Sequence, residues 1–236
     1  MRNLISRRIK DVQRYLASAI IRGSIIMRRQ YTFNSGERMY HLDLSFAHPN
    51  VLSSCSPGRI RKMRTYLDSG SELIESDRGL VTVHGTYNGM PVTAFSTGMG
   101  PASVSITLPE VIEACDDNDM TIIRLGTAGG LQAHLNIGDF VATTAVQRAE
   151  STSDKIMGLG YQAAADELVK STLVVAAQRN KRNYQQVYNG PTRTTDDIYF
   201  DALESKKGKH SSVLAVSMEF SVYCALRDRY NHDQNR

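Results

Sequence analysis

MTIIRLGTAGG, residues 120–130, is the stretch that decides the fold. Its first half is an apolar run typical of a buried parallel strand, and it ends in Arg124 before a glycine-rich loop that carries Thr127. Because an ionised arginine is costly to bury alone, Arg124 should meet a carboxylate or a bound anion. Ligands collect at the carboxyl ends of such strands, where the N–H groups of a glycine-rich loop can receive phosphate oxygens. The stretch therefore predicts an oxyanion site, with a buried ion pair as the alternative.

The segments around this strand alternate between helix and strand patterns. Ser56 and Pro57 predict the start of a helix that continues through Leu67. Asn88-Gly89 predicts a tight hairpin between strands at 80–87 and 91–95. Further elements are expected as a helix at 101–115 kinked by Pro109, a strand at 138–146, and helices at 163–177 and 219–227. This order predicts an α/β fold with a mixed sheet flanked by helices.

Length and composition suit one globular domain, since the chain has 236 residues and is 41% hydrophobic. Three cysteines, Cys55, Cys115 and Cys224, are widely spaced without a CxxC or zinc-ligand pattern, which favours a reducing compartment and no metal. No apolar run approaches the length of a membrane span, so we expect no membrane partner. Residues 1–36 hold eight Lys and Arg against one acid, so of the +4 total this segment carries +7 and the remaining 200 residues −3. The body is therefore not expected to bind nucleic acid.

The basic segment, taken as residues 1–38, is Arg-rich and acid-poor, and its apolar residues recur at helix-like intervals. This composition is that of a mitochondrial transit peptide, so a mitochondrial location is the alternative to a cytoplasmic one. A solvated extension, or a translated stretch upstream of a start at Met27 or Met39, would also explain it. Residues 39–236 are expected to form the folded domain.

Five motifs in order carry a family resemblance: STGMGPASVSI (96–106), TIIRLGTAGGL (121–131), IGDFVATTAV (137–146), TTDDIY (194–199) and VSMEFSVYCAL (216–226). Together they resemble the nucleoside phosphorylase superfamily, most closely the uridine phosphorylase type. The resemblance implies a three-layer α/β/α fold with a mixed central sheet. It also implies a pentosyltransferase reaction in which a nucleoside, with uridine as the leading candidate, and orthophosphate give a free base and ribose 1-phosphate. The resemblance implies no cofactor, and it implies assembly as a homodimer or a trimer of dimers.

The same resemblance assigns the site. Phosphate falls to Arg59, Arg78, Arg124 and Thr127, ribose to His41, Met218 and Glu219, and the base to Ile198 and Tyr199. Arg124 and Glu219 are the catalytic candidates, while Arg78 and His41 would reach a neighbouring subunit's site. Four of them have a plainer interpretation from the residues alone: Arg59 on a solvated basic helix face, Arg78 in a surface turn, Met218 in the core, and Glu219 at a helix N-terminus.

Three departures from the family pattern bear on activity. Cys55 stands where the family has a glycine beside the phosphate. The stretch 200–204 lacks the Gln and Arg that read uracil, and Ile198 replaces a stacking Phe. The chain stops at Arg236, before a further strand, loop and final helix, so we expect a C-terminally shortened domain. These departures leave open a purine nucleoside or methylthioadenosine phosphorylase, or an impaired paralogue that acts as a binding or partner subunit.

Overall fold

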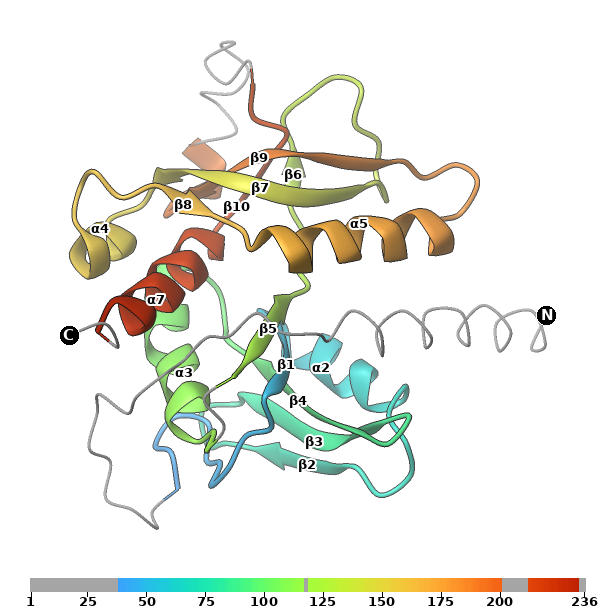
Figure 1. Cartoon of the computed structure of the whole chain (residues 1–236), viewed down its shortest axis with the longest axis vertical. Helices are drawn as coiled ribbons and strands as arrows, with labels where there is room; N and C mark the ends of the chain where they lie inside the picture. Colours follow the sequence, from blue (N-terminus) through green and yellow to red (C-terminus); the bar gives the residue numbers. More distant parts are fainter. Residues whose placement is uncertain (1–37, 117–118, 201–211, 234–236) are drawn as a thin grey trace.

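The computed structural model describes residues 38–116, 119–200 and 212–233 (Figure 1). The strands are β1 (Asn50–Ser54), β2 (Glu72–Glu75), β3 (Val81–Tyr87), β4 (Met90–Ser96), β5 (Thr121–Arg124), β6 (Gly129–Gly130), β7 (Phe140–Ala149), β8 (Ala163–Ala164), β9 (Val187–Thr195) and β10 (Ala215–Ser217). The helices are α2 (Pro57–Arg64), α3 (Pro101–Glu113), α4 (Thr152–Met157), α5 (Glu167–Asn180) and α7 (Phe220–Asp233). The predicted basic extension lies outside the described residues except for Arg38.

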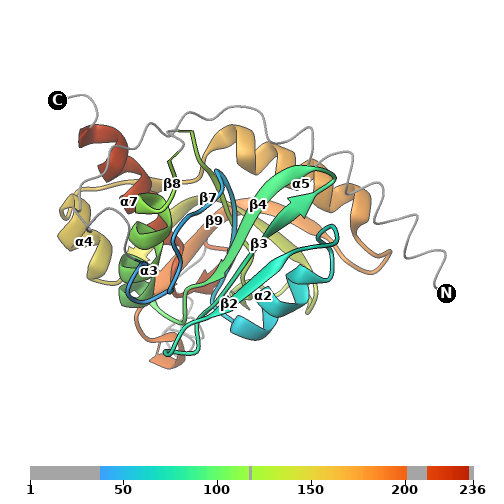
Figure 2. The same ribbon diagram turned by 90° about the horizontal axis from the view of Figure 1, so that it is seen from below.

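The first sheet has the strand order β2-β3-β4-β1-β5. Its β1 runs parallel to β4 and β5, whereas β2, β3 and β4 are antiparallel neighbours. Helix α2 covers one face, where Ile60 packs with Val81, Val83 and Ala94. Helices α3 and α7 cover the other face and form the largest core cluster with Val51 and Phe95. Figure 2 shows α2 and α3 on opposite faces of this sheet.

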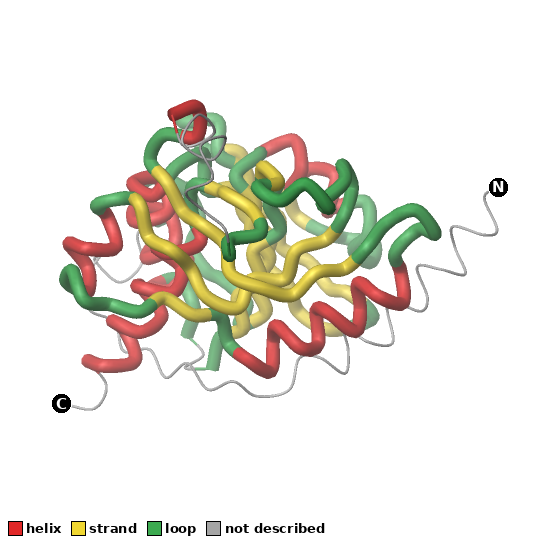
Figure 3. Tube along the Cα trace, turned by 90° about the horizontal axis from the view of Figure 1, so that it is seen from above, coloured by secondary structure: helices red, strands yellow, loops and turns green. Residues whose placement is uncertain are grey.

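The second sheet has the order β6-β10-β9-β7-β8, with β10, β9 and β7 parallel to one another. Helix α7 lies between the two sheets, because Cys224 also packs against Val146 and Ala163 of β7 and β8. The predicted α/β class with mixed strand directions is confirmed, and Figure 3 shows the strands in the middle of the view with helices on either side of them. The strands divide between two sheets where the sequence predicts one, because the chain leaves the first sheet after Arg124 and pairs next with β10.

Local signals account for most element boundaries. The Ser56 side chain accepts a hydrogen bond from the Arg59 N–H at the start of α2. Asn88 and Gly89 both have positive φ, 50° and 77°, as a tight hairpin turn requires. Helix α3 continues through Pro109 to Glu113. Helix α5 begins at Glu167 and not at 163, because Ala163 and Ala164 pair with β7 and Asp166 caps the Val169 N–H. None of the helices in the described part of the chain combines the length and apolarity that crossing a bilayer requires.

Because His84 of β3 is buried, we expect the folded protein to lose stability in acid. It is 3% exposed and stacks on Phe46, and burial together with nearby His48 lowers its pKa from 6.5 to about 4. Because the unfolded chain binds this proton more readily, stability is fully present above pH 6.5 and falls as the pH approaches 4, by about 1–3 kcal/mol.

Urea unfolding between pH 7 and 4 checks this expectation. His84→Gln should flatten the pH dependence, while His134→Gln, which removes an exposed histidine, should leave it unchanged. Equal slopes in the wild type and the His84 variant would contradict the prediction.

Candidate active site

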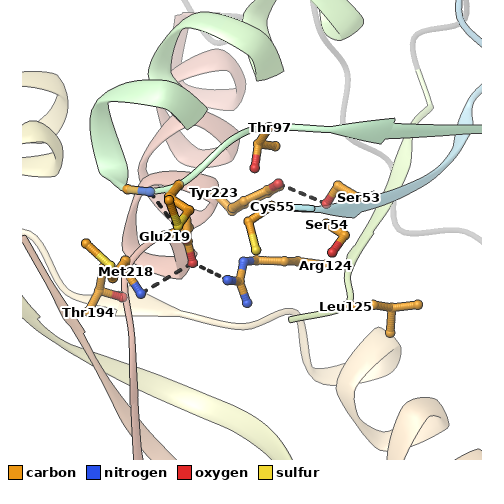
Figure 4. Close-up of polar contacts among 12 residues, drawn as sticks. Ser53, Ser54, Cys55, Thr97, Arg124, Leu125, Thr194, Met218, Glu219 and Tyr223 are labelled. Carbon is orange, nitrogen blue, oxygen red and sulfur yellow. Dashed lines mark hydrogen bonds and ion pairs between the residues drawn. The ribbon is translucent and has the colours of Figure 1, made fainter. Parts of the chain in front are cut away.

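The carboxyl ends of β1 and β5 meet the start of α7 at one place (Figure 4). Ser53 of β1 is in register with Arg124 of β5, so the last residues of both strands point to the same end of the sheet. Met218 and Glu219 connect β10 to α7 and approach from the second sheet. The site is thus built from segments that are far apart in the sequence.

Arg124 and Glu219 form a buried ion pair between Nη2 and Oε2. Their side chains are only 9% and 5% exposed. The Glu219 carboxylate also accepts hydrogen bonds from the backbone N–H of Gly100 at 3.2 Å and of Met218 at 3.3 Å. Of the two partners predicted for Arg124, the structure therefore shows the carboxylate, and that carboxylate is the predicted ribose ligand. The arginine has five N–H donors, so pairing with Glu219 does not use all of them.

Arg59 approaches this pair from the first turn of α2. Its Nη1 donates hydrogen bonds to Ser54 Oγ and to the carbonyl of Leu125, the latter at 3.3 Å. The partly exposed Cys55 places its Sγ 3.9 Å from the same nitrogen. Arg59 therefore lies beside the end of β5 and is not on a remote surface, so two guanidinium groups flank the position where β1 and β5 end.

The loop after β5 borders a cleft of about 1320 Å³, which Arg59, Arg124, Thr127 and Tyr223 help to line. Gly126 lies directly under the Arg124 guanidinium, because a Cβ atom at this position would overlap Nη1 and lie 2.6 Å from Cζ. The absence of a side chain at Gly126 therefore allows this close approach of the guanidinium to the backbone. Thr127 is exposed in the same loop, where its hydroxyl can reach a ligand in the cleft.

Several polar residues of the site escaped the sequence analysis. Tyr223 donates a hydrogen bond to Ser53 Oγ at 2.9 Å, and burial raises its pKa to about 12, so the phenol stays protonated near neutral pH. Figure 4 shows Thr97 beside Tyr223 and Thr194 beside Met218. Tyr223 follows Glu219 by four residues, and in the predicted helix 219–227 this spacing would place both on one face, which could have indicated Tyr223.

His41 and Arg78 form a second cluster, which Tyr40 joins. The Tyr40 ring packs edge-on against His41, with centroids 4.9 Å apart, and Arg78 Cζ lies 5.3 Å from the ring centroid. Arg78 Nη2 is also 3.4 Å from the Tyr40 hydroxyl. His41 Nδ1 lies 2.6 Å from Oε1 of the buried Glu110. Within the described residues no hydrogen bond or ion pair joins either residue to Arg124. Their assignment to a neighbouring subunit's site stays a prediction.

The predicted base contacts lie in the segment after β9. Ile198 is partly buried and Tyr199 is 84% exposed, and the Tyr199 N–H donates to the side chain of Asp197. In the described part of the chain neither makes a recorded polar contact with Arg124 or Glu219. Their role in base binding stays a prediction.

Fold and site together define an α/β protein that presents arginines and a carboxylate at the ends of parallel strands. Residues 51–231 match the model of the phosphorylase superfamily, and the chain belongs to this family. Among its relatives are a guanosine phosphorylase from Halorubrum lacusprofundi, 31% identical over 77% of this chain and 73% of the relative, and a uridine phosphorylase from Haemophilus influenzae, 31% identical over 68% and 63%. The chain thus spans less than two thirds of the length of the Haemophilus influenzae relative. Both relatives are phosphorylases by name.

The fold has a counterpart among solved structures. A uridine phosphorylase from Vibrio fischeri ES114 superposes with a TM-score of 0.70 at 24% identity, covering 84% of this chain and 82% of that one. The family resemblance found in the five sequence motifs is therefore confirmed at the level of family and fold.

Proposed function

We propose that the protein catalyses reversible phosphorolysis of a nucleoside, with orthophosphate as co-substrate and without a resident cofactor or metal. The observation that carries the proposal is the Arg124–Glu219 pair beside Arg59 at the ends of β5 and β1. It places donors for a phosphate dianion next to a carboxylate that can accept hydrogen bonds from ribose hydroxyls.

In this mechanism Arg124 and Arg59 hold phosphate, and Thr127 adds a hydroxyl donor. The glycosidic C1′–N bond breaks first, and its electron pair leaves with the base, which takes up a proton from solvent. The ribose becomes oxocarbenium-like, and a phosphate oxygen then supplies the electron pair for the new C1′–O bond. Glu219 and the phosphate dianion stabilise the positive charge, so catalysis rests on positioning and electrostatics.

Uridine is the first candidate nucleoside substrate, but we expect its turnover to be low. Stretch 200–204 lacks the Gln and Arg that the resemblance assigns to uracil recognition, and a site without its polar partners loses discrimination by orders of magnitude. The similarity to a guanosine phosphorylase favours a purine nucleoside as the second candidate. A non-catalytic binding or partner subunit is the third candidate, favoured by Cys55 in place of the family glycine and by the missing Gln and Arg in stretch 200–204.

Two further properties belong to the proposal. A homodimer would bring His41 and Arg78 of one subunit to the site of the other. Cytoplasm is the proposed location, with mitochondria as the alternative through residues 1–38. Light scattering of the purified chain at micromolar concentration tests the first property, since a monomer would exclude the shared site.

The activity test is base release from uridine, guanosine, inosine and 5′-methylthioadenosine, each with and without phosphate. We expect phosphate-dependent turnover of at least one nucleoside in the ordinary range of about 1–1000 per second, with uridine slower than the best substrate. Phosphate-induced thermal stabilisation of the same sample shows whether the anion site is intact. A folded, phosphate-binding protein that releases no base from any of the four would establish the binding-subunit alternative.

A further inference from the structure

Glu110 is a buried carboxylate that binds the segment 39–42 through hydrogen bonds. It lies on α3 and is 2% exposed. Its oxygens accept the backbone N–H of His41 at 2.9 Å and of Leu42 at 2.9 Å, and Oε1 lies 2.6 Å from the imidazole Nδ1 of His41. Two N–H donors from the backbone thus satisfy the buried carboxylate oxygens.

Both carboxylate oxygens of Glu110 already act as acceptors for backbone N–H groups, so we assign the proton of the short contact with Oε1 to Nδ1 of His41. A neutral imidazole protonated at Nδ1 has an unprotonated Nε2. The imidazole is partly exposed, with 30% of its side-chain surface accessible, and within the described residues no group bonds to Nε2. His41 therefore presents a hydrogen-bond acceptor outward.

The backbone around His41 is fixed as firmly as the side chain. The N–H of Met39 bonds the Leu44 carbonyl and the N–H of Asp43 bonds the Met39 carbonyl, both at 2.7 Å. Met39, Leu42 and Leu44 are buried in the same core cluster as α3. The position and direction of the imidazole are thus set by the fold before any ligand binds.

We propose that Glu110 is a positioning residue for the ribose contact that the family resemblance assigns to His41, the 5′-hydroxyl of a nucleoside in the neighbouring subunit. Glu110 fixes His41 in the Nδ1–H tautomer, so that Nε2 can accept the hydrogen bond from that hydroxyl. The inference rests on the proposed function and specifies its substrate class. A 5′-hydroxyl can donate to Nε2, whereas a 5′-methylthio group or a 5′-deoxy carbon cannot. The site therefore selects nucleosides with a free 5′-hydroxyl over 5′-thioether nucleosides.

The kinetic test compares kcat/KM for a nucleoside with that for its 5′-deoxy analogue, using the full chain and uridine or guanosine, whichever is turned over faster. One hydrogen bond should give a preference of about tenfold for the hydroxyl. His41→Ala and Glu110→Leu should each reduce this ratio to about one, and the double variant should reduce it no further. Glu110→Gln, which keeps one acceptor oxygen and is the milder change for folding, should shift the ratio in the same direction. Glu113→Gln, one turn along the same buried helix face, should leave the ratio unchanged.

A loss of activity that leaves the ratio unchanged in the Glu110 variants would show that Glu110 only supports the fold, and would overturn the inference. An unchanged ratio in an active His41→Ala enzyme would overturn it as well, by removing His41 from ribose recognition. If the wild type turns over no nucleoside, the proposed function fails, and the ¹⁵N spectrum of the histidine rings decides on Glu110 separately. The expected spectrum has protonated Nδ1 and bare Nε2 at His41, lost in Glu110→Leu, whereas the opposite tautomer in the wild type would refute the positioning role.

Discussion

Glu219→Ala is expected to abolish phosphorolysis and to lower the free energy of unfolding by about 3–5 kcal/mol, because it leaves Arg124 buried without a partner. Turnover should fall by at least about 100-fold, since the carboxylate beside the ribose is removed. Phosphate binding should persist, because both arginines remain and Arg124 is released from competition. Added phosphate should therefore raise the melting temperature of the variant by more than that of the wild type.

Urea unfolding and thermal shifts with and without phosphate measure these effects. Glu75→Ala is a matched control, because Glu75 pairs with Arg61 in an ion pair whose side chains are 49% and 42% exposed. It should cost no more than about 1 kcal/mol and leave turnover intact. If Glu219→Ala were as mild as Glu75→Ala, or kept wild-type turnover, the pair would be neither a structural nor a catalytic centre.

Local sequence signals were sufficient for much of the fold. The cap at Ser56, the turn at Asn88-Gly89 and the strand ending at Arg124 depend on neighbours a few residues away, and the structure contains all three. Strand β1 escaped prediction because its sequence, NVLSS, is short and ends in two serines that are typical of a turn. Both serines are fully buried in the structure, where Ser54 binds Arg59 and Ser53 binds Tyr223.

The site was harder to predict because its contacts join distant segments. The sequence indicated that Arg124 needs an anionic partner, but it could not choose between phosphate and a carboxylate 95 residues away. Glu110 gave no signal at all, since an acid in a helix is ordinarily solvated and its partners lie 68 and 69 residues earlier. Only the packing of α3 against residues 39–44 makes this carboxylate a buried acceptor.

In the proposed mechanism the ion pair would let Arg124 serve two partners, Glu219 and phosphate. Glu219 is held by Arg124 and by the Gly100 N–H, so its position is set by both sheets and by the start of α3. Phosphate bound to the remaining donors of Arg124 would then lie at a fixed distance from the Glu219 carboxylate, which would contact the ribose. Relative placement of the two reactants is the main contribution that such a site can make to catalysis.

Gly126→Ala is expected to disrupt this placement without touching any charged residue. The new Cβ would overlap the Arg124 guanidinium, so the end of that side chain would have to shift and its pairing with Glu219 would change. We expect phosphate affinity and kcat/KM to fall by about 100-fold, the size of effect seen when one preorganised donor is lost. Isothermal titration with phosphate and the nucleoside assay measure the two quantities independently.

Gly58→Ala provides the matched control, because a Cβ at Gly58 meets only Ser56 Oγ at an ordinary 3.7 Å and alanine favours the helix at that position. That variant should bind phosphate and turn over substrate like the wild type, with equal or higher stability. Wild-type phosphate affinity in Gly126→Ala would mean that the Arg124 guanidinium can leave the Gly126 backbone at no cost to the anion site. The contact between Arg124 and Gly126 would then be incidental, and the site would depend on Arg59 and Thr127 in place of the ion pair.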